Sequence, residues 1–266
     1  MLAITPIKSH NPSFGIFFNN VNNEDGEIRY RGDTVICRDD LYFPDVIDFL
    51  DNKYKNTPKV NVIIHACSDG EEVYSFLGVL ISKLKEKAAK FLPLKAKDID
   101  REHLKLAKRG VYNITNTEFL MANEYMNGEF FNFFEIMPKQ GSNDPRLKNT
   151  KTIKVEYSLK SLVDFKQSDI LTDVLKINLK NTVLFARNFW PYLSHQDRLK
   201  LAKNLSNKMD STSTLIIGDY DKECNTDEIL KAAGFVETAV DNVYEKSTNI
   251  NSKTNIYNYQ KLYLYK

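Results

Sequence analysis

The chain has 266 residues, of which 42% are hydrophobic and 27% are charged, and its formal net charge at pH 7 is +2. This length suits one sizeable α/β domain or two small ones. The near-neutral balance predicts neither a nucleic-acid partner nor a membrane-surface partner. No run approaches the roughly 20 apolar residues of a membrane span, so we expect no membrane insertion. Polar residues interrupt the first 20 positions, which argues against a secretory leader and predicts a cytoplasmic protein.

Cysteine and histidine spacing argues against a metal centre. The three cysteines are far apart and form no C-x-x-C pair, so neither a disulfide framework nor a cysteine zinc site is expected. The four histidines lack the i, i+4 spacing of a zinc-binding helix; they are His10, His65, His103 and His195.

The first half of the chain alternates between helix and strand patterns. Residues 1–33 are polar and rich in turns, and we expect them to form a lead-in segment before one domain over 34–266. Hydrophobic periodicity then predicts helix, strand, helix, strand and helix in turn; their ranges are about Tyr42–Tyr54, Val60–His65, Glu72–Lys90, Leu92–Asp98 and Asp100–Arg109. Gly110 suits the position just after the last of these helices.

The pattern changes in the middle of the chain. Glu129–Met137 and Thr152–Tyr157 alternate like antiparallel strands, which predicts an inserted β-hairpin subdomain over about 128–160. The α/β pattern then resumes with strands and helices; the strands are Leu162–Ser168, Asn181–Ala186, Thr214–Gly218 and Phe235–Glu245, and the helices are Ser194–Lys208 and Ile229–Gly234. The C-terminal tail, 247–266, is aromatic, and Ile256–Leu264 has the composition of a further strand.

The most informative segment is Val60–Ser75, VNVIIHACSDGEEVYS. A β-branched run leads to small residues that include Cys67, Asp69-Gly70 turns the chain, and Glu71-Glu72 opens a helix. In a parallel sheet such a turn is the place for a nucleotide-like cofactor. Two carboxylates at the helix start disfavour a pyrophosphate and favour a ligand that brings hydroxyls or positive charge.

Four segments together resemble one family, the S-adenosylmethionine-dependent methyltransferases of the CheR type, which methylate glutamates of chemotaxis receptors. The segments occur in family order: TVICRDDLYFP (Thr34–Pro44), CSDGEEVYS (Cys67–Ser75), KDIDREHLKLAKRGVY (Lys97–Tyr112) and ARNFWPYL (Ala186–Leu193). The resemblance implies an α/β fold of the class I methyltransferase type: a Rossmann-like, mostly parallel sheet with helices on both faces and an inserted antiparallel β-hairpin subdomain. It also implies S-adenosyl-L-methionine as cofactor and S-adenosyl-L-homocysteine as product.

The resemblance assigns cofactor roles around the turn. Asp98 ends a strand where an acidic residue accepts the ribose hydroxyls; the alternative is a helix N-cap, for which Asp100 is the better candidate. One of Glu71 and Glu72 approaches the ammonium of the cofactor, although both could simply complement the helix dipole. Three neighbours of these residues complete the expected cofactor set in this region: Cys67, Gly70 and Ile99.

Arg38 and Thr34 precede the sheet. The resemblance implies that Arg38 binds near the cofactor carboxylate or helps frame the transfer site, and that Thr34 forms a hydrogen bond nearby. The alternative for Arg38 is a solvated contact with Asp39 or Asp40. The pair Asp169-Ile170 is placed around the adenine, with an Asx-turn as the alternative.

Asn188 and Phe189 follow a buried strand, where the resemblance places them against the methionine part of the cofactor. Tyr192 then walls the methyl-transfer site, so the expected catalytic residues are Arg38 and Tyr192. Plain packing at a strand end is the alternative. Trp190-Pro191 replaces smaller residues, and His65 and Asp69 also depart from the family pattern.

The sequence therefore predicts transfer of a methyl group to a protein glutamate carboxylate. Two alternatives stay open: another acceptor, or a degenerate binding module without turnover. Only 33 residues precede Thr34 in this chain, whereas receptor methyltransferases of this type carry a helical domain there.

A protein substrate is expected to dock on the hairpin by strand addition at the free edge of Thr152–Tyr157. Phenylalanines 130, 131, 133 and 134 lie close together in the hairpin, with packing on the body as their alternative role. The lysines of the helix around Lys83–Lys90 fit a solvated face and not a nucleic-acid site.

Overall fold

The computed structural model describes residues 21–22, 28–29, 34–138 and 150–247. The chain divides into two compact units, Met1–Arg31 and Gly32–Lys266. In the first unit, β1 (Val21–Asn22) pairs antiparallel with β2 (Ile28–Arg29). The strand expected over Ile256–Leu264 and the rest of the aromatic tail lie outside the described residues.

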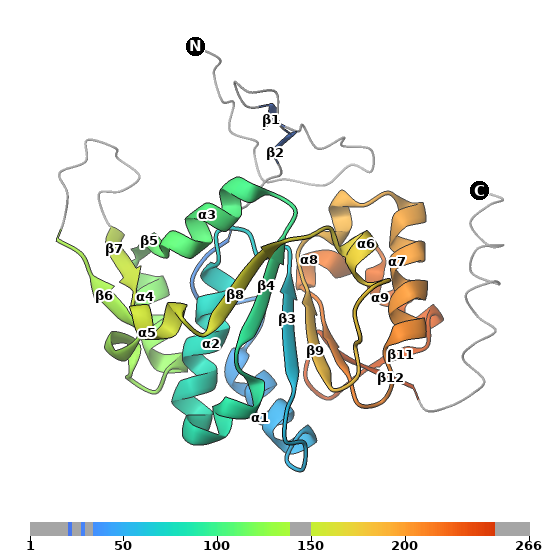
Figure 1. Cartoon of the computed structure of the whole chain (residues 1–266), viewed down its shortest axis with the longest axis horizontal. Coiled ribbons are helices and arrows are strands. Elements are labelled where there is room, and N and C mark those ends of the chain that lie inside the picture. Colours follow the sequence, from blue (N-terminus) through green and yellow to red (C-terminus); the bar gives the residue numbers. More distant parts are fainter. Residues whose placement is uncertain (1–20, 23–27, 30–33, 139–149, 248–266) are drawn as a thin grey trace. The chain divides into compact units, whose positions relative to one another are not determined.

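A seven-stranded sheet forms the centre of the second unit (Figure 1). Its order is β11 (Phe235–Glu237), β12 (Val243–Lys246), β10 (Thr214–Ile216), β9 (Thr182–Ala186), β3 (Asn61–His65), β4 (Leu94–Asp98) and β8 (Val163–Gln167). The pairs among β8, β4, β3, β9 and β10 are parallel, and β12 is antiparallel to both of its neighbours. The expected mostly parallel, Rossmann-like sheet is confirmed.

Helices cover both faces of this sheet because successive strand residues point to opposite sides. Val62 and Ile64 belong to the core beneath α1 (Phe43–Lys53) and α2 (Glu71–Leu84). Ile63, between them in the strand, belongs to a second core. That core contains buried residues of three further helices, α6 (Ile170–Asp173), α7 (His195–Lys208) and α9 (Thr226–Ala232).

Local chemistry explains where the helices begin and end. Asp100 caps α3 (Arg101–Arg109) by accepting from the backbone N–H of Glu102 at 2.7 Å, and Gly110 follows the helix in the left-handed conformation, φ 61°. The expectation of one helix to Lys90 is wrong. Lys85 has φ 52°, which ends α2, and the chain continues as the 3₁₀ helix η1 (Lys85–Phe91).

The inserted subdomain is a three-stranded antiparallel sheet beside the main sheet (Figure 1). Its order is β5 (Val111–Thr115), β7 (Thr150–Val155) and β6 (Phe134–Ile136), so the expected pairing of β6 with β7 is confirmed. The expected free edge at Thr152–Tyr157 is wrong because β7 is the central strand. The predicted elements did not include β5, although its burial alternates as in a half-buried strand, with Tyr112 and Ile114 buried.

Helices surround this small sheet, and three of the four phenylalanines pack into the main core. The helices are α4 (Asn116–Tyr125), η2 (Phe130–Asn132) and α5 (Tyr157–Lys160). Phe130, Phe133 and Phe134 are buried, whereas Phe131 is 59% exposed. The alternative of packing on the body therefore holds for three of them.

The C-terminal part of the sheet also differs from expectation. Phe235–Glu245, expected as one strand, is the antiparallel hairpin β11–β12 with a left-handed Asn242, φ 66°, just before β12.

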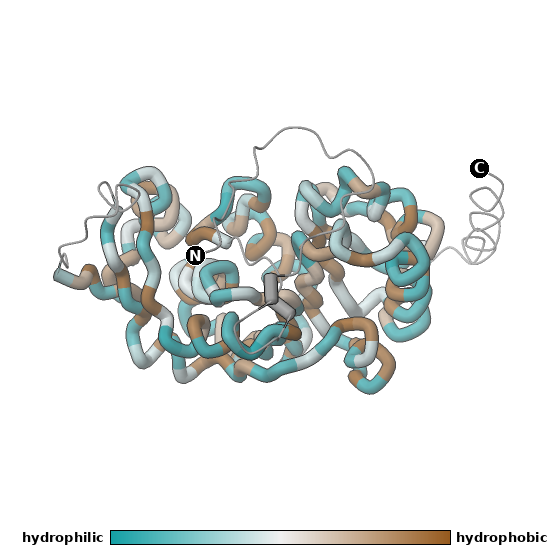
Figure 2. Tube along the Cα trace, turned by 90° about the horizontal axis from the view of Figure 1, so that it is seen from above, coloured by the Kyte–Doolittle hydropathy of each residue, from teal (hydrophilic) through white to brown (hydrophobic). Residues whose placement is uncertain are grey.

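Hydrophobic and hydrophilic residues alternate along the trace in Figure 2. Within the described ranges, no helix combines the length and apolar character needed to cross a membrane.

Candidate functional site

The carboxyl ends of β3, β4 and β9 meet at one edge of the main sheet, which we call the carboxyl edge. β3 pairs with β4 on one side and with β9 on the other, and the intervening connections cross opposite faces. In open α/β sheets, ligands bind outside the carboxyl ends of the strands at such a switch of direction. The segments expected to bind cofactor after Val60–His65, Leu92–Asp98 and Asn181–Ala186 all lie at this edge.

The turn after β3 has a strained backbone. Three of its residues have positive φ: Ala66 (55°), Ser68 (48°) and Gly70 (90°). A Cβ atom at Gly70 would lie 2.9 Å from the Cβ of Ala107 on α3, so both the conformation and the close approach require glycine. Cys67, expected beside the cofactor, is buried within this turn, and its backbone N–H donates to the carbonyl of Lys97 at 3.0 Å.

Asp69 ties the turn to the elements beside it. Its side chain lies 2.6 Å from Nδ1 of His103 on α3, and its carbonyl accepts from the hydroxyl of Tyr112 on β5 at 2.7 Å. Asp69, which departs from the family pattern, is therefore held by contacts with His103 and Tyr112.

Asp98 lies at the end of β4 and faces the turn. Its carboxylate accepts from the backbone N–H of Ser68 at 2.7 Å and from that of Asp100 at 2.9 Å. Burial raises the pKa of Asp98, and the two backbone hydrogen bonds oppose the rise. The N-cap role belongs to Asp100, so Asp98 keeps the position expected for a ribose ligand; the ribose contact itself stays a prediction.

The two glutamates of the turn have different surroundings. Glu72 pairs with Nη1 of Arg187, whose Nη2 lies 2.7 Å from Oδ1 of Asp40. Glu71 has a buried Oε2 without a hydrogen-bond partner, and burial, reinforced by Asp69, raises its pKa to about 8. An unpartnered carboxylate oxygen suits an incoming ammonium, so Glu71 is the better candidate of the pair.

Arg38 belongs to a segment that is fixed on α2. The backbone N–H of Cys37 donates to Oγ of Ser75 at 2.8 Å, and that hydroxyl donates to the carbonyl of Glu71 at 2.6 Å. Arg38 is partly exposed, and its positive charge opposes the burial that raises the pKa of Glu71 and of Glu72. Thr34 is also partly exposed.

Asp221 organises the loop after β9, and sequence reasoning missed it. Its carboxylate is fully buried and accepts from the backbone N–H groups of Gly218 and Asn188, both at 2.7 Å, and of Trp190 at 3.2 Å. Burial raises the pKa of Asp221 to about 7. Asn188 is left-handed, φ 60°, and a Cβ at Gly218 would lie 2.1 Å from its Oδ1. The signal in the sequence was a polar run, GDYD, directly after a buried strand.

The other residues of the segment Ala186–Leu193 divide between core and surface. Trp190 is fully buried and donates from Nε1 to the carbonyl of Ala186 at 2.8 Å, so it fills the second core. Phe189 stacks on it with ring centroids 5.6 Å apart. Tyr192 is partly exposed on the short helix η4 (Trp190–Tyr192). The roles of Phe189 and Tyr192 stay predictions.

Asp169 and Ile170, the residues expected around the adenine, follow the end of β8, whereas Ile99, expected in the cofactor set, follows β4. Asp169 caps α6 by accepting from the backbone N–H of Leu171 at 2.9 Å, which is the Asx-type contact of the alternative. Ile170 is 8% exposed and Ile99 is 41% exposed. A carboxylate has a second oxygen, so the cap does not prevent an adenine contact, which also stays a prediction.

Unpartnered acceptors show what the site lacks. Within the described ranges, four buried carboxylate or amide oxygens at the carboxyl edge have no hydrogen-bond partner: Glu71 Oε2, Asp100 Oδ2, Asn188 Oδ1 and Asn242 Oδ1. Leaving such atoms buried is costly unless a ligand supplies donors. An ammonium group and ribose hydroxyls are such donors, so these residues fit S-adenosylmethionine. No group of three or more His, Cys, Asp or Glu residues among the described residues could hold a metal ion.

The strand order and the site define a protein of the class I methyltransferase type. The family model "CheR methyltransferase, SAM binding domain" matches residues 32–234, and the chain belongs to this family of S-adenosylmethionine-dependent methyltransferases. S-adenosylmethionine is its cofactor.

Relatives and solved structures agree at low identity. A chemotaxis protein methyltransferase of Borreliella burgdorferi is 25% identical over 185 residues, which cover 64% of this chain and 59% of that protein. A TehB-like SAM-dependent methyltransferase of Corynebacterium glutamicum is 11% identical, with a TM-score of 0.40 over 79% of this chain and 90% of that one. A SAM-dependent methyltransferase of Clostridium acetobutylicum is 15% identical, with a TM-score of 0.35 over 68% and 50% of the two chains. The family match and the sheet order, not these TM-scores, define the fold.

Proposed function

We propose that this methyltransferase esterifies the side-chain carboxylate of a glutamate in a protein. When bound, S-adenosylmethionine supplies a methyl group activated by its sulfonium. A carboxylate oxygen of the acceptor forms the new bond to the methyl carbon while the carbon–sulfur bond breaks and its electron pair stays on sulfur. No proton moves, and a glutamate with a reference pKa of about 4.3 needs no general base at neutral pH.

The position of Arg38 carries the proposal. The segment that bears it is fixed on α2, and the positive charge of Arg38 acts on the carboxylates of Glu71 and Glu72. A partly exposed guanidinium next to the cofactor turn suits a carboxylate acceptor, because its fork of donors matches the two oxygens. The protein then has mainly to orient the acceptor and exclude water. The name of the Borreliella burgdorferi relative, chemotaxis protein methyltransferase, supports a protein as the acceptor.

The acceptor is tested with the cytoplasmic fragment of a chemotaxis receptor and radiolabelled S-adenosylmethionine. We expect label that alkali releases as methanol, and no label when the receptor glutamates are replaced by glutamine. Arg38→Lys keeps the charge but loses the planar fork, so methylation should fall while cofactor binding persists. A product whose label resists alkali would contradict a methyl ester, and cofactor binding without any transfer would favour a binding module.

We further propose that the protein substrate docks at β6, an edge strand of the three-stranded sheet. Met137 N–H donates to the carbonyl of Thr152, and Glu156 N–H donates to that of Phe133. Alternation then turns the N–H groups of Phe134 and Ile136 away from β7, and of these two residues only Ile136 is exposed at the edge. Ile136 is 40% exposed and Phe131, just before the strand, is 59% exposed. Together they offer main-chain donors and apolar contacts to an added strand.

Ile136→Pro tests this edge because proline removes an outward N–H without removing a bond between β6 and β7. Ile136→Val is the matched control, since it keeps the N–H. We expect the proline variant to lose methylation of the protein acceptor while its affinity for S-adenosylhomocysteine stays unchanged. Equal activity of the two variants would contradict docking at β6.

A further inference from the structure

His65 and Lys97 lie side by side at the carboxyl edge. They are register partners on β3 and β4, and their relative exposures are only 2% and 7%. Both donate to one oxygen of Asp173, the last residue of α6: His65 Nε2 lies 2.9 Å from Oδ2 and Lys97 Nζ lies 2.5 Å from it. Burial would raise the pKa of Asp173, but these two hydrogen bonds hold it well below its usual range. We call these three residues the α6 clamp.

Stability alone does not account for the α6 clamp. Charged groups lose hydration when they are buried, and apolar residues at the same positions would avoid that cost. Ile170 and Val174 already bury the apolar side of α6 in the second core. The two hydrogen bonds to one carboxylate oxygen instead fix the position of Asp173 relative to both strands.

Asp173 is one helical turn away from Asp169 and Ile170, which are expected to contact the adenine. α6 has only four residues, and it begins directly after Asp169, whose side chain caps it. At the same end, the backbone N–H of Ser168 donates to the carbonyl of Asp98 at 2.8 Å. The segment 168–173 is therefore tied to the end of β4 at its start and to the α6 clamp at its end. A shift of Asp173 must move Asp169 and Ile170.

We propose that the α6 clamp positions Asp169 and Ile170 against the adenine ring and thereby sets selectivity for its exocyclic amino group. The proposal rests on the cofactor assignment of Asp169 and Ile170 and is independent of the methyl acceptor. His65, Lys97 and Asp173 are positioning residues in this account, since they act through α6.

The test compares binding of S-adenosylhomocysteine with binding of S-inosylhomocysteine, which carries an oxygen in place of the amino group. For the parent protein, calorimetry should give at least about tenfold weaker binding of the inosine analogue, the scale of one lost hydrogen bond to a charged group. Asp173→Asn should lower this ratio toward one, because a neutral amide oxygen holds the two donors of the clamp less strongly than a carboxylate oxygen does. Asp164→Asn, an exposed carboxylate on β8, is the matched control and should keep the parent ratio.

Each outcome decides the proposal. Equal weakening of both ligands in Asp173→Asn, with an unchanged ratio, would show a merely structural role and overturn it. A parent that does not discriminate, or an Asp169→Ala variant that discriminates like the parent, would overturn the adenine assignment together with the clamp. If Asp173→Asn does not fold by circular dichroism, Lys97→Met decides by the same ratio, because it removes one donor and leaves the carboxylate. Acceptor methylation does not enter these measurements.

Discussion

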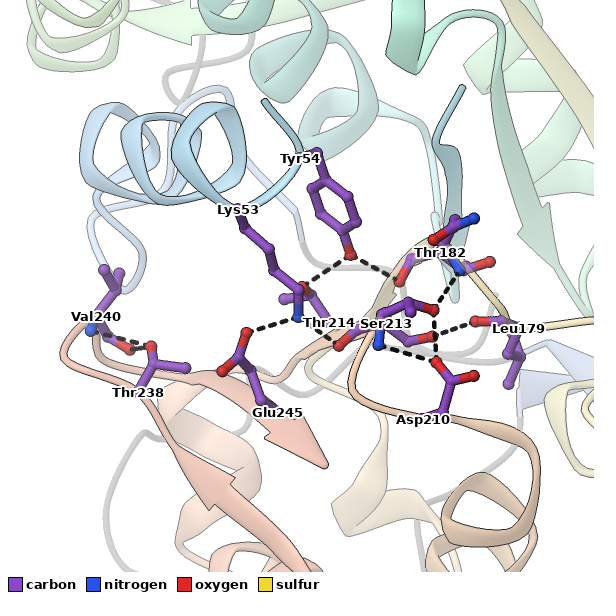
Figure 3. A network of polar contacts seen from close by, with 12 residues as sticks. Lys53, Tyr54, Leu179, Thr182, Asp210, Ser213, Thr214, Thr238, Val240 and Glu245 are labelled. Atoms are coloured by element: carbon purple, nitrogen blue, oxygen red, sulfur yellow. Dashed lines mark hydrogen bonds and ion pairs between the residues drawn. The ribbon is translucent and has the colours of Figure 1, made fainter. Parts of the chain in front are cut away.

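The two edges of the main sheet carry similar polar residues, but their side-chain hydrogen bonds are complete at one edge and incomplete at the other. At the amino edge, where the parallel strands begin, Lys53 donates to the carbonyl of Ser213 at 2.8 Å and to Glu245 at 2.6 Å, and the hydroxyl of Tyr54 lies 3.1 Å from Oγ1 of Thr214 (Figure 3). Of the residues labelled in Figure 3, the five at the amino edge that form these bonds, Lys53, Tyr54, Ser213, Thr214 and Glu245, have no buried side-chain nitrogen or oxygen without a partner. Among the described residues, the carboxyl edge has four such oxygens, in Glu71, Asp100, Asn188 and Asn242.

The difference shows how one sheet separates stability from binding. Hydrogen bonds that are complete within the protein contribute to its stability. Buried acceptors without partners lower the stability of the free protein, and a bound ligand that supplies donors restores it. α1 connects the two edges, since it starts after Asp40 and ends at Lys53. Variants at the carboxyl edge should therefore change cofactor affinity, and variants at the amino edge should change stability alone.

The largest effect on affinity is expected at Gly70. Gly70→Ala should weaken binding of S-adenosylhomocysteine by more than about 200-fold, because the new Cβ would meet Ala107 at 2.9 Å and displace the turn. Gly128→Ala is the matched control: Gly128 also has positive φ, 81°, but a Cβ there meets nothing within 4 Å. Both variants carry the backbone strain, so calorimetry should show the loss of affinity only for Gly70→Ala. Equal losses would mean that strain and not close approach matters.

A smaller loss is expected at Asp98. Asp98→Ala removes the acceptor of the ribose hydroxyls and should cost about 1.5–3 kcal/mol of binding free energy, which is roughly 10- to 150-fold in affinity. Asp164→Ala on β8 should bind like the parent. If Asp98→Ala binds as tightly as Asp164→Ala in calorimetry, Asp98 serves only the backbone of the turn.

Glu71 should make cofactor affinity depend on pH. Its pKa of about 8 means that the free protein holds a proton on Glu71 near pH 6–7, and pairing with the cofactor ammonium requires that proton to leave. Affinity should therefore rise by up to about tenfold per pH unit between pH 6 and 7.5. Glu71→Gln should abolish the slope, while Glu124→Gln, an exposed glutamate on α4, should keep it. If the affinity of Glu71→Gln still depends on pH in the same way, the partner of the cofactor ammonium is Glu72 or another group.

The smallest effect on affinity belongs to the amino edge. Lys53→Met keeps the apolar stem but removes two hydrogen bonds, which should lower the free energy of unfolding by about 2 kcal/mol and the melting temperature by roughly 4–8 °C. Binding of S-adenosylhomocysteine, measured well below that melting temperature, should be unchanged. A loss of affinity in this variant would show that α1 couples the two edges.

The sequence by itself determined the elements that depend on neighbours in the chain. Local sterics and capping account for three such features, and adjacent residues were enough to predict each of them. They are the β-branched run before Cys67, the glycine at position 70, and the boundaries of α3 at Asp100 and Gly110. The same order placed Asp98, Asn188 and Glu71 at strand ends and therefore at one edge of a parallel sheet.

Only the tertiary structure decided matters that depend on partners far along the chain. Whether Glu71 or Glu72 keeps an unpartnered oxygen depends on Arg187, more than a hundred residues later, and the role of Asp221 depends on three backbone amides that meet it across two strands. β7 is central because both β5 and β6 pair with it. The alternation of residues within Thr150–Val155 predicts a strand but does not indicate which strands lie beside it. Burial, which raises the pKa of Glu71, likewise results from packing and is invisible in the residue itself.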